Sequence, residues 1–318
     1  MSRRVAITGA TGFIGRKLAM RHMAQGDQVR VLSRRTPDES GLSASVHWFS
    51  GDLTGVTDLQ AFVADADVLY HCAGEIRDTS RMEALHVDGA RRLIEAASGR
   101  IGRWVQLSST GTYGQRRSGI VTELSDLKPR GMYEVTKLQS DNLVQAASSS
   151  GAFQHVILRP SIVYGAEMPN QSLYNLVSMI RRGWFFFIGK PGASANYIQV
   201  DNVVEALLLC AQTPEASGQV YNLSDHRTLE DFVAYIAQSL GCDVPRTRLP
   251  EMPIRALAAL IGGIPGMPLT QTRVDALTAS AIYSDEKIER ELGYRHVVSM
   301  EEGLQELVKA YKQQFSSL

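Results

Sequence analysis

The chain opens with a short apolar run that three regularly spaced glycines follow at once. Residues 5–8 are Val-Ala-Ile-Thr and residues 9–15 are Gly-Ala-Thr-Gly-Phe-Ile-Gly, which gives the spacing G-x-x-G-x-x-G. An amphipathic stretch at 16–25 and a second strand-like run at 28–32 come next. This order predicts a strand, a tight turn, a helix and a second strand, which together make a βαβ unit.

Each glycine of the loop has its own use. Gly9 allows the tight turn, Gly12 lets backbone N–H groups approach a phosphate, and Gly15 lets the helix pack closely on the strand. The helix start adds unpaired N–H groups and the positive end of the helix dipole. The loop therefore predicts binding of a dinucleotide pyrophosphate, although an ordinary tight turn is the less specific interpretation. The candidate binding residues are Gly9, Thr11, Gly12, Phe13, Ile14 and Gly15.

The composition argues against several classes of protein. The chain has 318 residues, 33 basic and 33 acidic, so its net charge of zero does not suggest a nucleic-acid binder. Cys72, Cys210 and Cys242 are too scattered for a disulfide framework or a metal site, and they suit a reducing compartment. The chain shows no signal peptide, and its apolar runs are shorter than the ~20 residues of a membrane helix. We therefore expect a cytoplasmic protein without a bound metal.

Strand-like and helix-like patterns alternate through the first half of the chain. The helical patterns are clearest at 82–98 and 133–148. The strand-like runs lie at 5–8, 28–32, 46–49, 68–72, 104–107 and 155–158. This alternation predicts an α/β fold with a doubly wound parallel sheet, a Rossmann fold, in which ligands sit beyond the carboxyl ends of the strands.

After residue 165 the pattern becomes less regular. An aromatic run at 184–187 and a Gly-Lys-Pro-Gly turn at 189–192 interrupt the alternation. Strand-like or helical patterns return at 196–200, 201–211, 229–240, 284–292 and 300–314. We expect residues 1–165 to form mainly the dinucleotide-binding Rossmann domain and 166–318 to form mainly a smaller α/β substrate-binding part. Residues 197–225 are expected to return to the Rossmann domain.

Tyr133 and Lys137 stand four residues apart in a helical stretch, so they share one helix face. A phenol titrates near pH ~10 in water, which is too high for a base at neutral pH. A neighbouring ammonium group and the positive ring of an oxidised nicotinamide would favour the phenolate and lower its pKa. Lys137 could also hold the cofactor ribose. Taken alone, the pair is more typical of an ordinary helix surface.

Ser109 adds a third group to this pair. It lies just after the strand-like run 104–107, where its hydroxyl would face the same crevice as Tyr133. It could bond the substrate oxygen whose proton Tyr133 gives or takes, although residues 108–110 also suit plain turn chemistry. Together with the nucleotide loop, the three residues Ser109, Tyr133 and Lys137 predict a hydride-transfer enzyme that acts on a small molecule.

Further short motifs are distributed along the chain. They are Gly51-Asp52-Leu53, His71-Cys72-Ala73-Gly74, Ser108-Ser109 with Tyr113-Gly114, Leu158-Arg159-Pro160-Ser161-Ile162-Val163-Tyr164-Gly165, Tyr197-Ile198-Gln199-Val200-Asp201-Asn202-Val203 and Glu291-Leu292-Gly293-Tyr294. Through these, the glycine loop and Tyr133-x-x-x-Lys137, the chain resembles the extended short-chain dehydrogenase/reductase family over nearly its whole length. This family is also called the NAD-dependent epimerase/dehydratase family.

The resemblance implies roles for individual residues. Ser109, Tyr133 and Lys137 would take the family's catalytic roles. Asp52 and Leu53 would line the adenine end of the cofactor, and Ala73 and Gly74 would lie beneath it. Pro160, Ser161 and Ile162 would flank the nicotinamide. The family also commonly forms a homodimer through two helices of each subunit. Residues 82–98 and 133–148 are candidates for these helices, and they could equally be ordinary covering helices.

The end of the second strand-like run bears on the choice of cofactor. NAD-selective folds usually have an acid here, whereas this chain has Ser33 followed by Arg34 and Arg35. Guanidinium groups suit a 2′-phosphate, so NADP(H) is favoured, with Ser33 and Arg34 as the candidate contacts. The alternative is a pair of solvated loop arginines in an enzyme that uses NAD(H).

Four positions depart from the family pattern. Thr110-Gly111 stand where sugar 4,6-dehydratases carry Asp-Glu, so we do not expect a dehydratase. His86 replaces an Asn that supports the catalytic proton network, and Gln199 replaces a common His. Ala195 stands where many nucleotide-sugar enzymes have an Arg that clamps the substrate diphosphate. The cations that could replace this Arg are Arg181, Arg182, Lys190 and Arg273.

Two classes of substrate stay open. One is a nucleotide-linked sugar, acted on by a keto-reductase or epimerase, and the turn at 189–192 resembles bacterial sugar epimerases. The other is a hydrophobic ketone or alcohol, as in the dihydroflavonol reductase and 3β-hydroxysteroid dehydrogenase branches. Ala195 and the aromatic run favour the second, although core packing explains the aromatic run more simply. We favour the sugar narrowly. A non-catalytic NADP(H)-binding sensor is the third alternative, which the presence of both Tyr133 and Lys137 disfavours.

Overall fold

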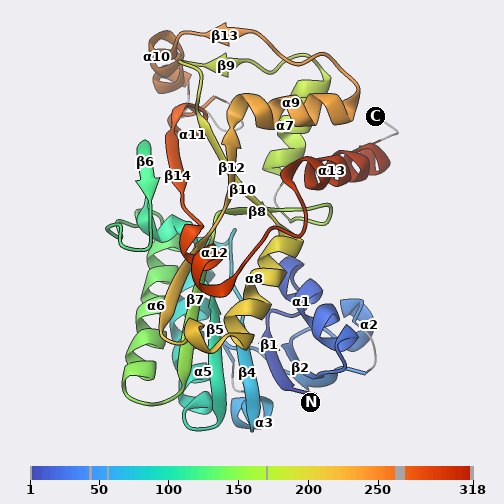
Figure 1. Ribbon diagram of the computed structural model, residues 1–318, viewed down its shortest axis with the longest axis vertical. Helices are drawn as coiled ribbons and strands as arrows, with labels where there is room; N and C mark the ends of the chain where they lie inside the picture. Colours follow the sequence, from blue (N-terminus) through green and yellow to red (C-terminus); the bar gives the residue numbers. More distant parts are fainter. Residues whose placement is uncertain (1, 43–44, 56, 170, 262–268, 316–318) are drawn as a thin grey trace.

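Seven parallel strands form the central sheet (Figure 1). This computed structural model describes residues 2–42, 45–55, 57–169, 171–261 and 269–315. The strands lie in the order β11-β7-β5-β4-β1-β2-β3. Their bounds are β1 (Arg4–Thr8), β2 (Gln28–Ser33), β3 (His47–Ser50), β4 (Ala66–His71), β5 (Ile101–Leu107), β7 (Gln154–Pro160) and β11 (Gln219–Leu223). The predicted doubly wound parallel sheet is confirmed.

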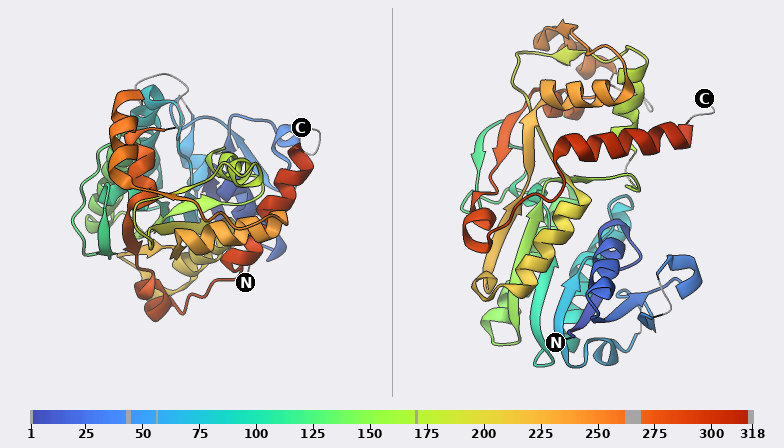
Figure 2. Two further views of the ribbon diagram at one scale, coloured as in Figure 1. Left: turned by 90° about the horizontal axis from the view of Figure 1, so that it is seen from above. Right: turned by 45° about the vertical axis from the view of Figure 1, so that its right-hand side comes forward.

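Helices cover both faces of this sheet, because successive side chains of a strand point to opposite sides. On β1, Val5 and Ile7 belong to the same buried cluster as Leu18, whereas Ala6 belongs to the cluster that contains Trp104. The first face is covered by α1 (Phe13–Ala24), α8 (Val200–Gln212) and α12 (Glu286–Leu292). The second is covered by α3 (Leu59–Val63), α5 (Gly89–Ala97) and α6 (Met132–Ser149) (Figures 1 and 2).

The strand order reverses between β1 and β4, which pair directly although α1, β2 and β3 separate them along the chain. Such a switch point leaves a crevice beyond the carboxyl ends of the strands. Thr8 and His71 end the two strands side by side, with Thr8 Oγ1 2.8 Å from His71 Nδ1. The candidate site residues Arg34, Ala73 and Ser109 all follow strands that end at this edge, so the fold brings distant motifs together.

A smaller group of elements lies beyond this edge, at the top of Figure 1. β8 (Ile162–Tyr164), β10 (Ser194–Gln199) and β12 (Asp225–Thr228) form a three-stranded sheet. Two further pairs join β9 (Phe187–Ile188) to β13 (Arg248–Leu249) and β6 (Ser118–Val121) to β14 (Ser280–Tyr283). The helices here are α7 (Ser172–Arg181), α9 (Leu229–Leu240), α10 (Glu251–Ile261), α11 (Gln271–Thr278) and α13 (Met300–Phe315).

The chain crosses between the two groups more than once. β11 pairs with β7 in the large sheet, whereas β10 pairs with β8 and β12 in the small one. In the small group, Tyr197 of β10 stacks on Phe232 of α9 with ring centroids 4.5 Å apart. The division of the chain at residue 165, and the return of 197–225, stay predictions.

The predicted helix at 82–98 is interrupted. A π-helical turn, Ala84–Asp88, separates α4 (Thr79–Glu83) from α5. The apolar spacing does not reveal this turn, which carries His86, and the ring nitrogens of His86 bond to Glu75 and Thr136 in two other segments. Such turns occur frequently at functional sites. Three more short helices are α2 (Pro37–Ser40) and the 3₁₀-helices Thr110–Tyr113 and Pro214–Ala216.

Candidate active site

The glycine loop forms a cradle of backbone at the end of β1. Gly9 has a φ of +70°, and the Gly12 N–H donates to its carbonyl oxygen at 2.9 Å. A Cβ added at Gly9 would stand 2.7 Å from the Ala73 nitrogen, and one at Gly15 would stand 2.3 Å from the Gly9 oxygen. α1 begins directly after Gly12 and has no acidic residue in its first turn. The loop therefore fits a dinucleotide pyrophosphate, which backbone N–H groups and the helix dipole would hold.

Ser109 and Tyr133 come together from two elements. Ser109 follows the end of β5, and its Oγ accepts a hydrogen bond from the Gly111 N–H at 3.0 Å. Tyr133 stands in the first turn of α6, is half-buried, and lies close enough to Ser109 for that side chain to lower its pKa. Lys137 lies one turn further along the helix and is buried, with 4% of its surface exposed. The structure thus assembles the three predicted residues.

The predicted lowering of the Tyr133 pKa needs both the Lys137 ammonium group and an oxidised nicotinamide, so it stays a prediction. Burial raises the pKa of Tyr133 above its usual 10, and the Ser109 side chain offsets only part of this rise. The Lys137 ammonium group donates to the Leu107 carbonyl oxygen, and burial lowers the pKa of Lys137. The lysine is thus directed at the backbone of β5 and does not lower the pKa of the tyrosine here. A phenol with a raised pKa keeps its proton at neutral pH, which suits a proton donor.

A buried polar network lies beneath these residues. The Asp141 carboxylate accepts hydrogen bonds from Ser108 Oγ at 2.7 Å and from Arg159 Nη2 at 3.2 Å. Arg159 also donates to the Tyr113 hydroxyl at 3.2 Å, which in turn donates to Asn222 Oδ1 at 2.8 Å. The network joins β5, α6, β7 and β11 under the site. Sequence reasoning missed it, although Asp141 follows Lys137 by four residues and so shares its helix face.

The predicted adenine-end residues also meet. Ser33 ends β2, and its Oγ accepts a hydrogen bond from the Arg35 N–H at 3.0 Å. Arg34 is exposed, and its guanidinium group lies 3.6 Å from the Asp52 carboxylate. Leu53 beside it is buried. An exposed arginine thus stands at the carboxyl end of β2, where a ribose or its phosphate would lie.

The residues implied for the underside of the cofactor and for the nicotinamide lie further along the same edge. Ala73 and Gly74 follow β4, and the Ala73 N–H donates to Thr8 Oγ1 at 3.3 Å. Pro160 ends β7 and is buried, whereas Ile162 begins β8 and is 54% exposed. Between them, the buried Ser161 Oγ has no hydrogen-bond partner among the residues that the structure describes.

Ala195, which stands where many nucleotide-sugar enzymes carry a diphosphate-binding arginine, lies in the core. Ala195 on β10 is 3% exposed and belongs to the buried cluster of α7, α9 and α13. The Arg181 guanidinium lies over the Tyr311 ring, and the Arg182 guanidinium lies over the Trp184 ring. Of the other two candidate cations, Lys190 is exposed in the turn before β10 and Arg273 lies in the first turn of α11. No cation therefore projects from β10 at the position of the family arginine.

The aromatic run is divided between core and surface. Phe185 and Phe187 are each 5% exposed and belong to the core of the smaller group, as core packing predicts. Phe186 is partly buried against the cluster beneath α10 and α11. Only Trp184 is largely exposed, at 64%. The run supplies packing first and at most one aromatic side chain for a ligand.

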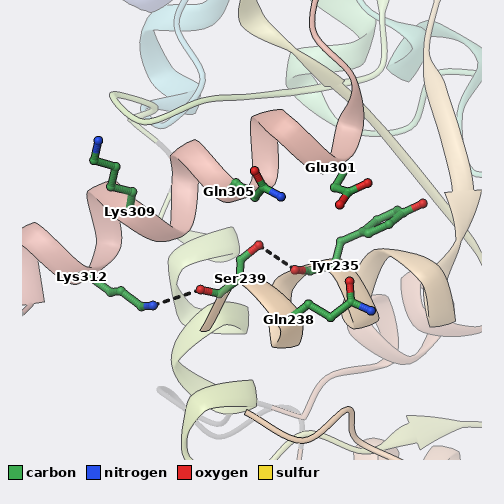
Figure 3. Close-up of a pocket in the computed structure, with 7 residues that line it drawn as sticks. All are labelled: Tyr235, Gln238, Ser239, Glu301, Gln305, Lys309 and Lys312. Atoms are coloured by element: carbon green, nitrogen blue, oxygen red, sulfur yellow. Dashed lines mark hydrogen bonds between the residues drawn. The ribbon is translucent and has the colours of Figure 1, made fainter. Parts of the chain in front are cut away.

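A groove between α9 and α13 lies apart from these residues (Figure 3). Its volume is about 420 Å³, and one of its lysines, Lys312, donates to the Ser239 carbonyl oxygen at 3.0 Å. Its lining residues are Tyr235, Gln238, Ser239, Glu301, Gln305, Lys309 and Lys312, and none of them is a predicted site residue. Within the described ranges, His, Cys, Asp and Glu side chains form no group of three that could hold a metal ion. In the same ranges, no helix combines the length and apolar character that crossing a membrane requires.

Residues 5–224 match the model of the family described as the NAD dependent epimerase/dehydratase family. The chain belongs to this family. The expected membership is thereby confirmed, and the chain is an NAD-dependent enzyme, an oxidoreductase or epimerase, of the extended short-chain dehydrogenase/reductase type.

Relatives of this family enzyme span its full length. It is 29% identical over 325 residues, 96% of each chain, to the 4-hydroxy-2-methyl-3-oxo-4-farnesyl-3,4-dihydroquinoline-1-oxide ketoreductase of Stigmatella aurantiaca. It is 25% identical to the Arabidopsis thaliana 3beta-hydroxysteroid-dehydrogenase/decarboxylase isoform 1, over 96% of this chain and 79% of that one. Its fold is similar to that of the Bacillus cereus UDP-glucuronic acid 4-epimerase in complex with NAD, with a TM-score of 0.76, 20% identity and coverage of 98% and 99%.

Proposed function

We propose that this enzyme interconverts a ketone and an alcohol on a hydrophobic small molecule, with Ser109, Tyr133 and Lys137 as its catalytic residues and NADP(H) as its preferred cofactor. The observation that carries the proposal is the interaction of the Ser109 side chain with the half-buried Tyr133 hydroxyl at the carboxyl edge of the sheet, which lowers the pKa of Tyr133 against the effect of burial. Two neighbouring hydroxyl groups can both bond one substrate oxygen.

The cofactor would be held by the glycine cradle, by Arg34 and Asp52 at the adenine end, and by residues 160–162 near the nicotinamide. A bound nicotinamide supplies or accepts a hydride. The missing acid at Ser33 and the exposed guanidinium group of Arg34 support NADP(H), because a guanidinium group can bond a 2′-phosphate with two donors. The contact with Asp52 is made by Nη1 of Arg34, and a guanidinium group carries five N–H donors.

During reduction, Ser109 and Tyr133 would donate hydrogen bonds to the substrate carbonyl oxygen and orient it. As the carbonyl carbon gains a hydride, negative charge grows on this oxygen, and the Tyr133 hydroxyl gives it a proton. The raised pKa of Tyr133 keeps that proton in place until the charge develops. Lys137 would hold the cofactor ribose, and Asp141, which accepts a hydrogen bond from Ser108, would tie α6 to the segment after β5. In the oxidation direction the phenolate form of Tyr133 would accept the proton, and the positive ring of an oxidised nicotinamide would favour this form.

The substrate class follows from the buried Ala195. No cation at this position can clamp a diphosphate, and the two relatives named above act, by their names, on a farnesylated quinoline oxide and on a hydroxysteroid. These observations move our preference from the nucleotide-linked sugar to a hydrophobic ketone or alcohol. A keto-reductase or epimerase of a nucleotide-linked sugar is the second candidate, which the Gly-Lys-Pro-Gly turn at 189–192 favours.

A thermal-shift screen tests the substrate class. The purified enzyme, supplied with NADP⁺ or NAD⁺, is heated with UDP-, GDP- and dTDP-sugars and, separately, with steroid-like ketones. A ligand that binds only the folded state raises the melting temperature. We expect shifts with the ketones and with NADP⁺; shifts with the nucleotide sugars alone would support the second candidate. Cofactor binding without hydride transfer to any carbonyl would indicate the non-catalytic sensor. The homodimer and the cytoplasmic location also stay proposals.

A further inference from the structure

His86 lies beside the tyrosine of the candidate site. It sits in the π-helical turn Ala84–Asp88 with 1% of its surface exposed. Its ring meets the Tyr133 ring nearly at right angles, at 79°, with the ring centroids 5.7 Å apart. The turn therefore packs a polar ring edge-to-face against the residue that would move the proton.

The two ring nitrogens of His86 bond to two separate segments. The Glu75 N–H donates to Nε2 at 2.8 Å, so Nε2 carries the lone pair. Nδ1 then carries the proton and donates to Thr136 Oγ1 at 2.8 Å. The Thr136 hydroxyl donates in turn to the Met132 carbonyl oxygen at 2.8 Å. Because every donor from the Glu75 N–H to the Thr136 hydroxyl has an acceptor, these bonds favour the tautomer of His86 that is protonated on Nδ1.

The two segments that His86 joins are parts of the site. Glu75 follows Ala73 and Gly74, and its carboxylate accepts the N–H groups of Ile76 and Arg77, each at 2.9 Å, so the loop after β4 is closed on itself. Met132 and Thr136 belong to the first turns of α6, where Tyr133 stands. His86 thus connects a closed loop to the helix turn that carries the phenol.

We infer that His86 is a positioning residue that holds Tyr133 in line with Ser109, an inference that rests on the proposed function. The phenol ring packs against the imidazole ring nearly at right angles, and the helix turn that carries the phenol is tied to His86 through Thr136. Burial and the nearby Lys137 lower the pKa of His86 to about 3, so the ring stays neutral and keeps both bonds at neutral pH. Misplacement of a reacting group by about 1 Å can cost about 10²-fold in rate.

Substitutions at His86 separate its two bonds. The amide of His86→Asn stands near the place of Nδ1 and can keep the bond to Thr136, whereas His86→Gln reaches the place of Nε2 and can keep the bond to Glu75. His86→Leu removes both bonds, and Thr136→Val removes the hydroxyl between the ring and α6. Thr278→Val is the matched control, because Thr278 also accepts from a side chain, Arg255, and donates to a carbonyl four residues earlier, but on α11.

We expect His86→Leu and Thr136→Val to lower kcat by about 10²-fold with little change in KM for the cofactor, and His86→Asn to recover most of the loss. Thr278→Val should leave kcat unchanged. If His86 has only a structural role, its variants will have a lower melting temperature but the wild-type kcat per folded enzyme. That result would overturn the inference. If Tyr133→Phe loses activity while His86→Leu keeps it, only this inference fails; if Tyr133→Phe keeps activity, the proposed function fails.

¹⁵N NMR of histidine-labelled enzyme gives a second measurement that does not depend on activity. The chain has seven histidines, and the signals absent from His86→Gln identify His86. We expect a neutral ring that carries its proton on Nδ1 at pH 7 and is still neutral at pH 5. A ring protonated on both nitrogens at pH 5, or the Nε2–H tautomer at pH 7, would overturn the inference.

Discussion

The backbone nitrogen of Ala73 lies so close to Gly9 that a Cβ added to Gly9 would stand 2.7 Å from it. Gly9 also has a φ of +70°, which side chains rarely adopt. The loop after β1 and the loop after β4 therefore touch backbone to backbone at the switch point of the sheet. Only glycine permits this approach, and the approach shapes the cradle for the pyrophosphate.

Gly9→Ala should accordingly destabilise the enzyme by about 2–5 kcal/mol, since it adds both overpacking and backbone strain, and should abolish cofactor binding. Gly99 is the matched control, because its φ of +68° is nearly the same but nothing lies within 4 Å of an added Cβ. Gly99→Ala should cost about 1 kcal/mol and leave binding intact. Urea unfolding and a cofactor fluorescence titration measure both variants, and equal losses would contradict the cradle.

Arg34→Ala tests the choice of cofactor. Loss of a charge-assisted bond to a 2′-phosphate costs about 1.5–3 kcal/mol, so KM for NADPH should rise about 10–100-fold while KM for NADH stays the same. Arg91→Ala is the control, because Arg91 pairs with Asp88 on an exposed helix surface. A wild-type enzyme that prefers NADH, with a preference that Arg34→Ala leaves unchanged, would remove the proposed role of Arg34.

Asp141→Asn tests the buried network. Asp141 and Arg159 are 0% and 4% exposed, and removal of one charge leaves the other buried without its partner, at a cost of about 3–5 kcal/mol. The same change at Asp88, whose pair with Arg91 is half-exposed, should cost below about 1 kcal/mol. Denaturant titration of the two variants compares them. Similar small losses at both positions would show that the network does not hold the elements together.

The stability of the enzyme should fall as the pH falls below about 6.5. Burial lowers the pKa of His71 from 6.5 to about 3, so the unfolded chain binds a proton in this window and the folded chain does not. The free energy of unfolding therefore decreases by about 1.4 kcal/mol per pH unit for this group, and the decrease is complete near pH 3. His71→Asn, whose amide can keep the bond to Thr8, should show a shallower pH dependence in urea titrations from pH 7 to pH 4. His47→Asn, at an exposed position, should match the wild type; a slope unaffected by His71→Asn would refute the assignment.

The features that the sequence predicted well depend on local spacing. The glycine loop needs only a strand, three glycines and a helix in order, and Tyr133 and Lys137 need only a separation of four residues on one helix. The strand alternation likewise predicted the parallel sheet, because each strand carries its own burial pattern. Each of these features depends on a spacing between residues that lies within one short segment of the chain.

The features that the sequence did not predict depend on contacts between distant segments. The Asp141–Arg159 pair joins α6 to β7, and His86 of the π-helical turn bonds to residues 75 and 136. The raised pKa of Tyr133 follows from burial, which the Tyr-Lys spacing does not report. The place of Ala195 in the core depends on which face of β10 it occupies, and the sequence pattern leaves this open.

The decisive kinetic test compares Tyr133 with a control tyrosine, Tyr235, which lines the groove between α9 and α13. The rate of hydride transfer to a ketone from the thermal-shift screen is measured by stopped flow for Tyr133→Phe and Tyr235→Phe, together with the Kd of each for NADPH. We expect Tyr133→Phe to be slower than wild type by about 10²–10⁴-fold with an unchanged Kd, and Tyr235→Phe to equal the wild type. Near-normal hydride transfer in Tyr133→Phe would contradict the proposal that this phenol supplies the proton.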